Sequence, residues 1–123
     1  MAAQRPVAAI QLQDPPPLRQ LTLGYHGWWN GWLLAVPVAL RLPADIDAIT
    51  NARTTKVPCL FITSGGDIRI PPRFQQRIFD ALSGPKQQVI IANARHCAPP
   101  DAAAATEIAR LRPWLLREAA ILK

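Results

Sequence analysis

An acid and a histidine each follow an apolar segment of the chain, close to the point where the segment ends. Asp67 comes after the apolar run at residues 59–62, and His96 comes after a second run at residues 88–91. Both runs are typical of strands buried in a parallel sheet. Because open α/β sheets place functional groups at the carboxyl ends of their strands, the two side chains are expected to meet there. A carboxylate beside an imidazole predicts acid–base chemistry.

The segment between the two predicted strands has the length and the pattern of a crossover helix. Pro71 and Pro72 open the segment, and Gly84 and Pro85 close it. Apolar residues recur between them at four-residue steps, at Phe74, Ile78 and Leu82. A connection of this kind is what joins two neighbouring parallel strands.

A third short strand is predicted at Val7–Leu12, where it is stopped by Asp14 and three prolines. The expected fold class is therefore α/β: a three-stranded parallel sheet with flanking helices, in a single domain of 123 residues. Asp14 also lies at a strand end, which makes it the alternative to Asp67 as the functional acid. The plainer interpretation of Asp14 is a carboxylate that opens a proline turn.

Two further helical segments are expected on either side of these elements. Residues 43–52 combine an acid-rich first turn with apolar residues at helical spacing. Residues 101–123 carry an apolar stripe that comprises Ile108, Leu111, Leu115 and Leu122. Pro113 interrupts this second pattern. A proline inside a helix costs about 3 kcal/mol, so the sequence predicts a kink or two shorter helices.

The motifs around the acid and the histidine resemble the C-terminal half of the α/β-hydrolase superfamily. They are S-G-G-D-I-R-I-P-P around Asp67, A-L-S-G-P-K after the predicted crossover, and A-N-A-R-H-C around His96. In that family the triad runs Ser, then Asp or Glu, then His. The resemblance implies that Asp67 and His96 are catalytic residues of a serine hydrolase that acts on ester or related acyl bonds, without a cofactor or a metal. The three strands would then form the last part of a hydrolase sheet, so that residues 1–123 are a partial domain.

The nucleophile of such a triad is missing, since the chain contains no G-x-S-x-G motif. Ser83 is expected at the end of the crossover helix, away from the strand ends. Ser64 has Gly66 two residues later, but Ile62 stands where the first glycine of a nucleophile elbow belongs. Cys97 directly follows His96 and is not expected to fold back onto the ring of its neighbour.

The sequence therefore predicts part of a hydrolase that is inactive alone, with an acyl substrate only if a nucleophile is supplied. Two alternatives stay open. The chain is a non-catalytic interaction module or subunit, or it is a complete small hydrolase with Ser64 as an atypical nucleophile.

Residues 18–55 contain three of the four tryptophans. The resemblance implies that this segment covers the active site like a lid, with a wall made of Tyr25, Trp28, Trp29 and Trp32. Aromatic side chains are equally typical of an ordinary core, and the sequence does not separate the two interpretations. The apolar part of the segment is interrupted by Gly31 and Pro37. It is shorter than the roughly 20 residues that a membrane span requires, so no span is expected.

The amino-acid composition argues against several other classes of protein. Half of the residues are hydrophobic, as in globular proteins. The net charge of +6 comes mainly from eleven arginines that are spread along the chain without a basic run, so no nucleic-acid partner is expected. Two cysteines that belong to no motif, Cys59 and Cys97, favour a reduced, cytoplasmic protein.

The predicted strand at Val7–Leu12 has neither a charge nor a proline within it. In a hydrolase sheet this strand has a neighbour on its far side, and the sequence shows no candidate for that neighbour. An uncovered strand exposes unpaired amide and carbonyl groups. The chain is therefore expected to self-associate through this edge or to pair there with the missing half.

Overall fold

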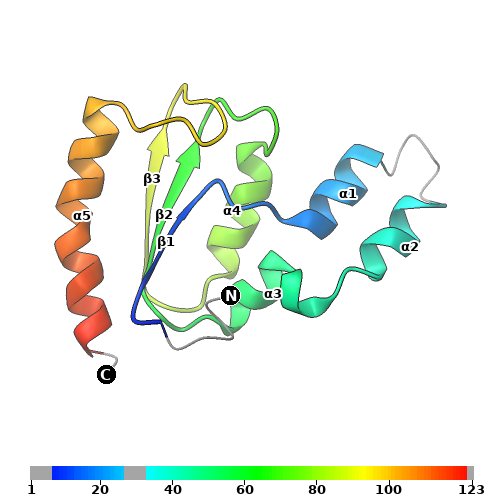
Figure 1. The fold of residues 1–123 in the computed structure, drawn as a ribbon, viewed down its shortest axis with the longest axis horizontal. Coiled ribbons are helices and arrows are strands. Elements are labelled where there is room, and N and C mark those ends of the chain that lie inside the picture. The colour runs from blue at the N-terminus through cyan, green and yellow to red at the C-terminus, as the bar shows by residue number, and fades with distance from the viewer. Residues whose placement is uncertain (1–6, 27–32, 122–123) are drawn as a thin grey trace.

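Three strands form one parallel sheet in the order β1-β2-β3, with β2 at the centre. They are β1 (Ile10–Gln13), β2 (Cys59–Ser64) and β3 (Lys86–Ile91). The computed structural model describes residues 7–26 and 33–121. The predicted α/β class, with a three-stranded parallel sheet and flanking helices, is confirmed (Figure 1).

The first strand begins three residues later than predicted and ends one residue later. Ile10 lies opposite Cys59, and the Ile10 amide donates a hydrogen bond to the Pro58 carbonyl at 3.0 Å. Continued toward Val7, the same register would place Ala9 opposite Pro58. Proline has no N–H group to donate to a neighbouring strand, so the ladder ends at this point.

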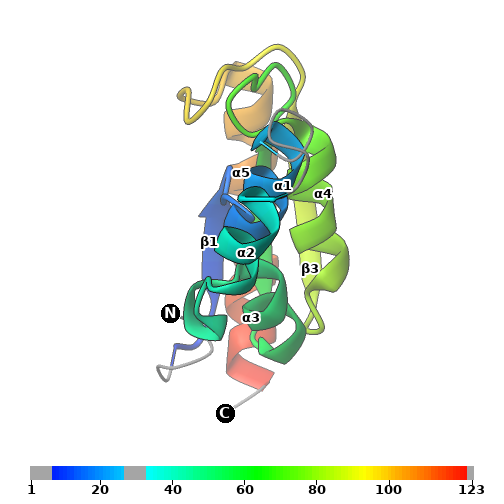
Figure 2. The same cartoon turned by 90° about the vertical axis from the view of Figure 1, so that its right-hand side faces the viewer.

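Helices cover both faces of the sheet. The helices are α1 (Leu18–His26), α2 (Ala35–Leu40), α3 (Ala48–Thr54), α4 (Pro72–Ala81) and α5 (Ala102–Ile121), with a 3-10 turn η1 (Ala44–Ile46) before α3. The helix α5 lies along one face, while α3 and α4 lie on the other (Figure 1). Figure 2 shows α1 to α4 together on the side opposite α5.

The central strand is buried on both faces, as its unbroken apolar run predicts. Leu60 and Ile62 belong to the core cluster that includes the buried side chains of α5. Cys59 and Phe61 belong to the cluster on the other face, with Ile78 of α4. Burying a side chain such as leucine or phenylalanine stabilises a fold by about 1.5–3 kcal/mol, so β2 anchors both layers.

The predicted crossover helix is confirmed as α4, and the segment at residues 43–52 forms two elements rather than one helix. Asp47 separates η1 from α3 and caps α3. Its Oδ1 accepts a hydrogen bond from the Ile49 amide at 3.3 Å, and its Oδ2 accepts one from the Thr50 hydroxyl at 2.8 Å. An aspartate at this position stabilises the start of a helix, and this explains the division.

Of the two outcomes predicted at Pro113, a division into two shorter helices is wrong, because α5 continues through the proline as a single helix. Pro113 is exposed on the solvent side of α5. Leu111 and Leu115, on either side of it, are buried in the cluster against the sheet. A proline removes one helical hydrogen bond, and apolar packing on both sides outweighs that loss. Leu122, the last member of the predicted stripe, lies outside the described residues.

Helices α1 and α2 pack against each other and extend away from the sheet (Figure 1). Several apolar side chains in and just before α2 are exposed, namely Leu33, Leu34, Val38 and Leu40. Within the described ranges, none of the helices combines the length and the apolar character needed to cross a membrane.

Candidate functional site

The loops that follow β2 and β3 lie side by side beyond the carboxyl ends of these strands (Figures 1 and 2). The Gly65 amide donates to the Ile91 carbonyl at 2.8 Å, and the Gly66 amide donates to the Ala94 carbonyl at 3.0 Å. A Cβ atom at Gly65 would lie 2.4 Å from the carbonyl oxygen of Ala92. Only glycine allows the backbones to approach this closely.

Asp67 and His96 extend from these two loops and form a hydrogen bond of 2.7 Å between Oδ2 and the ring nitrogen Nδ1. Their predicted proximity is confirmed. An ionised carboxylate can only accept a hydrogen bond, so Nδ1 carries the proton and donates it. The other ring nitrogen, Nε2, then has a free lone pair that can accept a proton. Asp67 is buried, whereas His96 is partly exposed.

Three other donors hold the carboxylate of Asp67 in place. Its Oδ1 accepts hydrogen bonds from the amides of Arg69 and Ile70, at 2.8 and 2.9 Å. The side-chain amide of Gln75 donates to the Ile70 carbonyl at 2.8 Å and approaches the Asp67 Oδ2 at 3.3 Å. Gln75 is fully buried, and it was not among the residues predicted for the site. The available signal was its position three residues before Ile78, on the buried face of α4.

The environment of Asp67 favours its ionised form. Burial alone would raise the pKa of this carboxyl group. Hydrogen bonds outweigh burial, and they come from the Ile70 amide, the His96 ring and the Arg69 amide. The pKa of Asp67 is therefore lower than its ordinary value, which keeps the carboxylate able to fix the tautomer of the imidazole.

This pKa shift predicts a stability difference that depends on pH. A carboxyl group with a lowered folded-state pKa stabilises the fold above its unfolded-state pKa of about 3.9, and the contribution is lost as the pH falls through the folded-state value. We expect Asp67→Asn to reduce the free energy of unfolding by about 2 kcal/mol at pH 7. The difference from the original chain should shrink below about pH 4.

Urea denaturation of both chains between pH 3 and pH 7 measures this difference. Asp45→Asn is the control, because Asp45 is an exposed acid and its replacement should have almost no effect. A difference that stays constant over the whole pH range would contradict the assignment of an ionised Asp67.

Asp14, the alternative acid, is buried and binds other groups. Its Oδ1 accepts from the Ser64 amide at 2.7 Å, and its Oδ2 accepts from the Ser64 hydroxyl at 2.6 Å and from the Cys97 amide at 2.8 Å. Within the described residues it forms no hydrogen bond with the ring of His96. Asp14 therefore connects the end of β1 to the end of β2 and to the loop after β3, while Asp67 orients the histidine.

The two serines of the chain are placed poorly for nucleophilic attack. Ser64 is fully buried, and its hydroxyl donates to Asp14 rather than to His96. Ser83 donates to the backbone carbonyls of Arg53 and Thr55, which precede β2 at the opposite end of the sheet. A nucleophile needs both an adjacent base and access to the substrate. Ser64 lacks access because it is buried, and Ser83, although exposed, bonds only to backbone carbonyls and has no base beside it.

The expectation for Cys97 is wrong. Its Sγ atom lies 3.6 Å from Nε2 of His96, the nitrogen that Asp67 leaves free. Cys97 has a φ angle of 52°, in the left-handed region that residues with side chains rarely adopt. This conformation turns the side chain of Cys97 back toward His96. No sequence pattern predicts such a conformation. The hydrogen bond from the Cys97 amide to Asp14 helps to hold the strained backbone.

The aromatic segment meets the site through Tyr25. Its hydroxyl is within hydrogen-bonding distance of the carbonyl oxygens of Ile68 and Arg69, at 3.1 and 3.2 Å, in the loop that carries Asp67. Its ring also lies 6.5 Å from that of Phe74, measured between centroids. The other predicted members of an aromatic wall, Trp28, Trp29 and Trp32, lie outside the described residues. The lid-like role of residues 18–55 stays a prediction.

A pocket of about 620 Å³ opens beside the acid–histidine pair. Its lining residues come from both loops and are Gly66, Asp67, Ile68, Arg69, Arg95 and His96. Two of the six are arginines, whose side chains favour a ligand that carries negative charge.

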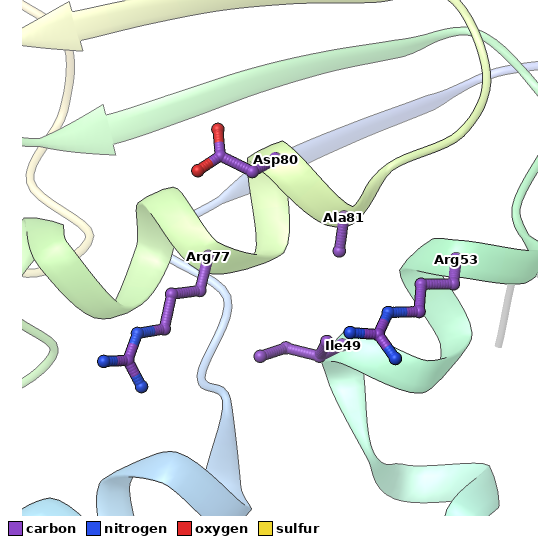
Figure 3. A pocket seen from close by; sticks show the side chains of 5 residues that line it. All are labelled: Ile49, Arg53, Arg77, Asp80 and Ala81. Carbon is purple, nitrogen blue, oxygen red and sulfur yellow. The ribbon is translucent and has the colours of Figure 1, made fainter.

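A second pocket, of about 560 Å³, lies between α3 and α4 (Figure 3). Arg53 and Arg77 extend along it, and the carboxylate of Asp80 points away from both guanidinium groups. Ile49 and Ala81 complete its lining. This pocket contains no histidine, serine or cysteine, and its one carboxylate, Asp80, has no imidazole beside it. The pocket at Asp67 and His96 is therefore the candidate site.

A metal ion fits this region less well than the side-chain types alone would indicate. One ligand atom each from Asp14, His96 and Cys97 lies within 4.8 Å of the others. However, the carboxylate of Asp14 already accepts three hydrogen bonds from the protein. Arg69 and Arg95 also line the adjoining pocket, and their positive charges oppose a cation.

No protein-family model and no curated protein matches this chain.

Proposed function

We propose that this chain supplies the acid and the histidine of a serine hydrolase that acts on ester or related acyl bonds. The observation that carries the proposal is the 2.7 Å hydrogen bond between buried Asp67 and the Nδ1 atom of His96. The sequence motifs around both residues, which resemble those of α/β-hydrolases, support it independently. The three-stranded parallel sheet has the layered arrangement that this resemblance implies.

Each residue of the pair has a distinct role in the proposed reaction. Nε2 of His96 accepts the proton of the attacking hydroxyl group and later gives a proton to the leaving group. Asp67 stays ionised, holds the ring in the required tautomer and stabilises the imidazolium that forms between these steps. General base catalysis of this kind contributes a factor of about 10²–10⁴ in rate.

The attacking hydroxyl must come from a group other than Ser64 and Ser83. Ser64 would have to leave Asp14 and the buried core before it could react, which disfavours the alternative of a complete hydrolase built on that residue. In steady-state turnover, the isolated chain is accordingly expected to hydrolyse p-nitrophenyl esters no faster than free imidazole does. The cytoplasmic location indicated by the two cysteines, both of which are free, is part of the same proposal.

A second candidate function is a non-catalytic interaction module. It is favoured by the position of β1 at the edge of the sheet and by the exposed apolar side chains at Leu33, Leu34, Val38 and Leu40. In that case the hydrogen bond between Asp67 and His96 would only stabilise the loops.

A fluorophosphonate probe separates these functions, because it forms a covalent bond with activated serine hydroxyls. The tagged chain is recovered, with its associated polypeptides, from the cells that make it naturally and is then treated with the probe. We expect an adduct on a serine outside this chain. His96→Gln should reduce the labelling rate by about 100-fold, whereas His26→Gln, a change at the only other histidine in the sequence, should not.

Three outcomes of the labelling experiment would contradict the proposal. An adduct on Ser64 would establish the complete small hydrolase. A labelling rate that His96→Gln leaves unchanged would show that His96 takes no part in the reaction. No labelling of any associated polypeptide would favour the interaction module.

A further inference from the structure

Cys97 completes a row of three reactive groups. The carboxylate of Asp67 lies 2.7 Å from Nδ1 of His96, and the Sγ atom of Cys97 lies 3.6 Å from Nε2 on the opposite side of the same ring. An acid, an imidazole and a thiol in this order correspond to the orienting group, the base and the nucleophile of covalent catalysis. The sulfur is therefore the group best placed to lose a proton to the imidazole.

Specific hydrogen bonds hold Cys97 and the loop after β3 in their conformation. Cys97 has a left-handed backbone with a φ of 52°, and its amide donates to the buried carboxylate of Asp14 at 2.8 Å. That carboxylate is in turn fixed by the amide and the hydroxyl of Ser64. Strained residues persist where the surrounding structure holds them, and they concentrate at functional sites.

We propose that Cys97 is a nucleophilic thiol activated by His96, at which the chain is covalently modified by electrophiles that carry negative charge, such as acyl esters with a negatively charged substituent. The proposal uses the acid–histidine pair but does not require the chain to be part of a hydrolase. In the acyl reaction the thiol proton moves to Nε2 of His96, and Sγ forms a bond with the carbonyl carbon. The bond to the ester oxygen breaks, and the departing oxygen takes the proton from the imidazolium.

Access and charge support this assignment. Cys97 is exposed, and Arg69 and Arg95 line the pocket that His96 also lines. Both cations favour an electrophile that is negatively charged. Cys59 provides a contrast, because it is buried in β2 and burial raises its pKa to about 12. The chain thus contains one accessible thiol beside a base and one inert thiol in the core.

Alkylation of the full chain by iodoacetate and by the neutral iodoacetamide tests the proposal. The rate is followed by intact mass at pH 7 in the presence of a chelator, and the modified residue is located by peptide mapping. We expect a single adduct on Cys97, formed at least about tenfold faster than on glutathione, because an ordinary thiol is only a few per cent ionised at this pH. Iodoacetate should be favoured over iodoacetamide more strongly than it is with glutathione.

Variants assign the effect to the proposed groups. His96→Gln should slow alkylation by about tenfold, while His26→Gln and Cys59→Ser should leave the rate unchanged. Arg95→Gln should lower the rate with iodoacetate more than the rate with iodoacetamide. If Cys97 of the unsubstituted chain is alkylated only as fast as glutathione, the proposal is overturned. This comparison does not depend on whether any variant folds. An alkylation rate that His96→Gln leaves unchanged would also overturn the proposal.

p-Nitrophenyl acetate extends the test to acyl transfer. We expect release of one equivalent of p-nitrophenolate, with one acetyl group retained on Cys97 and none on the Cys97→Ser chain. Acetylation of other residues alone would contradict the acyl reaction. If Cys97 is not acetylated, the hydrolase proposal is unaffected, because that proposal is tested by fluorophosphonate labelling of a serine on another polypeptide.

Discussion

Replacement of Asp14 by alanine is expected to destabilise the chain by about 3 kcal/mol or more. The change would leave three donors without an acceptor: the buried amide and hydroxyl of Ser64 and the partly buried amide of Cys97. Each such loss costs about 1–3 kcal/mol. Because a domain of this size is stable by only about 5–15 kcal/mol in total, a substantial fraction of the Asp14→Ala chain should be unfolded under mild denaturing conditions.

Thermal and urea denaturation measure this loss of stability, and two further variants serve for comparison. Asp14→Asn keeps one acceptor oxygen but places an NH₂ group near the Cys97 amide, so it should cost an intermediate amount. Asp45→Ala, at an exposed acid, should change stability by less than about 0.5 kcal/mol. If Asp14→Ala unfolds like the original chain, the network does not hold the strand ends together. The geometry proposed for Cys97 would then lose its support.

The purified chain is expected to associate with itself through β1, so that light scattering gives at least twice the mass of one chain. Within the described residues, β1 pairs with β2 on one side and has no strand on the other. Neither a charge nor a proline protects this edge. Ile10 and Leu12 also line an apolar groove of about 360 Å³ next to the edge, and apolar contact there would strengthen the association.

Gln11→Lys is the substitution that tests this edge. Gln11 is exposed, so a lysine adds charge to β1 without removing core packing, whereas Ile10 packs against the cluster around Phe61. We expect Gln11→Lys to shift the measured mass to that of a single chain. Gln87→Lys makes the same chemical change at an exposed position of β3 and should leave association intact. A monodisperse single chain before any substitution would show that this edge is not a pairing site.

The sheet and the acid–histidine pair could be predicted from local patterns. The run at Cys59–Ile62 is apolar on both faces, and that is a property of the residues themselves. The crossover pattern then requires β2 and β3 to be parallel, and parallel neighbours end at the same edge. Asp67 and His96 come just after those ends, so a topological rule and two sequence positions were sufficient to bring them together.

Local patterns failed where a competing contact decided the conformation. A proline inside a helical stripe predicts a kink or a division into two helices. The division does not occur, because Pro113 lies on the exposed side of α5 and packing of Leu111 and Leu115 holds the helix together. The expected extent of β1 was also wrong, because the missing N–H group lies in Pro58 of the neighbouring segment. In both cases the deciding contact involves a distant part of the chain.

The sequence by itself determined the α/β class, the parallel order of the strands and the meeting of Asp67 with His96, because each follows from the order of apolar and polar residues along the chain. Only the tertiary structure decided the roles of Asp14, Gln75 and Cys97. Asp14 binds Ser64 and Cys97 across 50 and 83 positions of sequence, and no local pattern encodes hydrogen bonds over such separations. Cys97 has a left-handed backbone whose amide donates to Asp14, and its thiol lies beside the free nitrogen of the histidine.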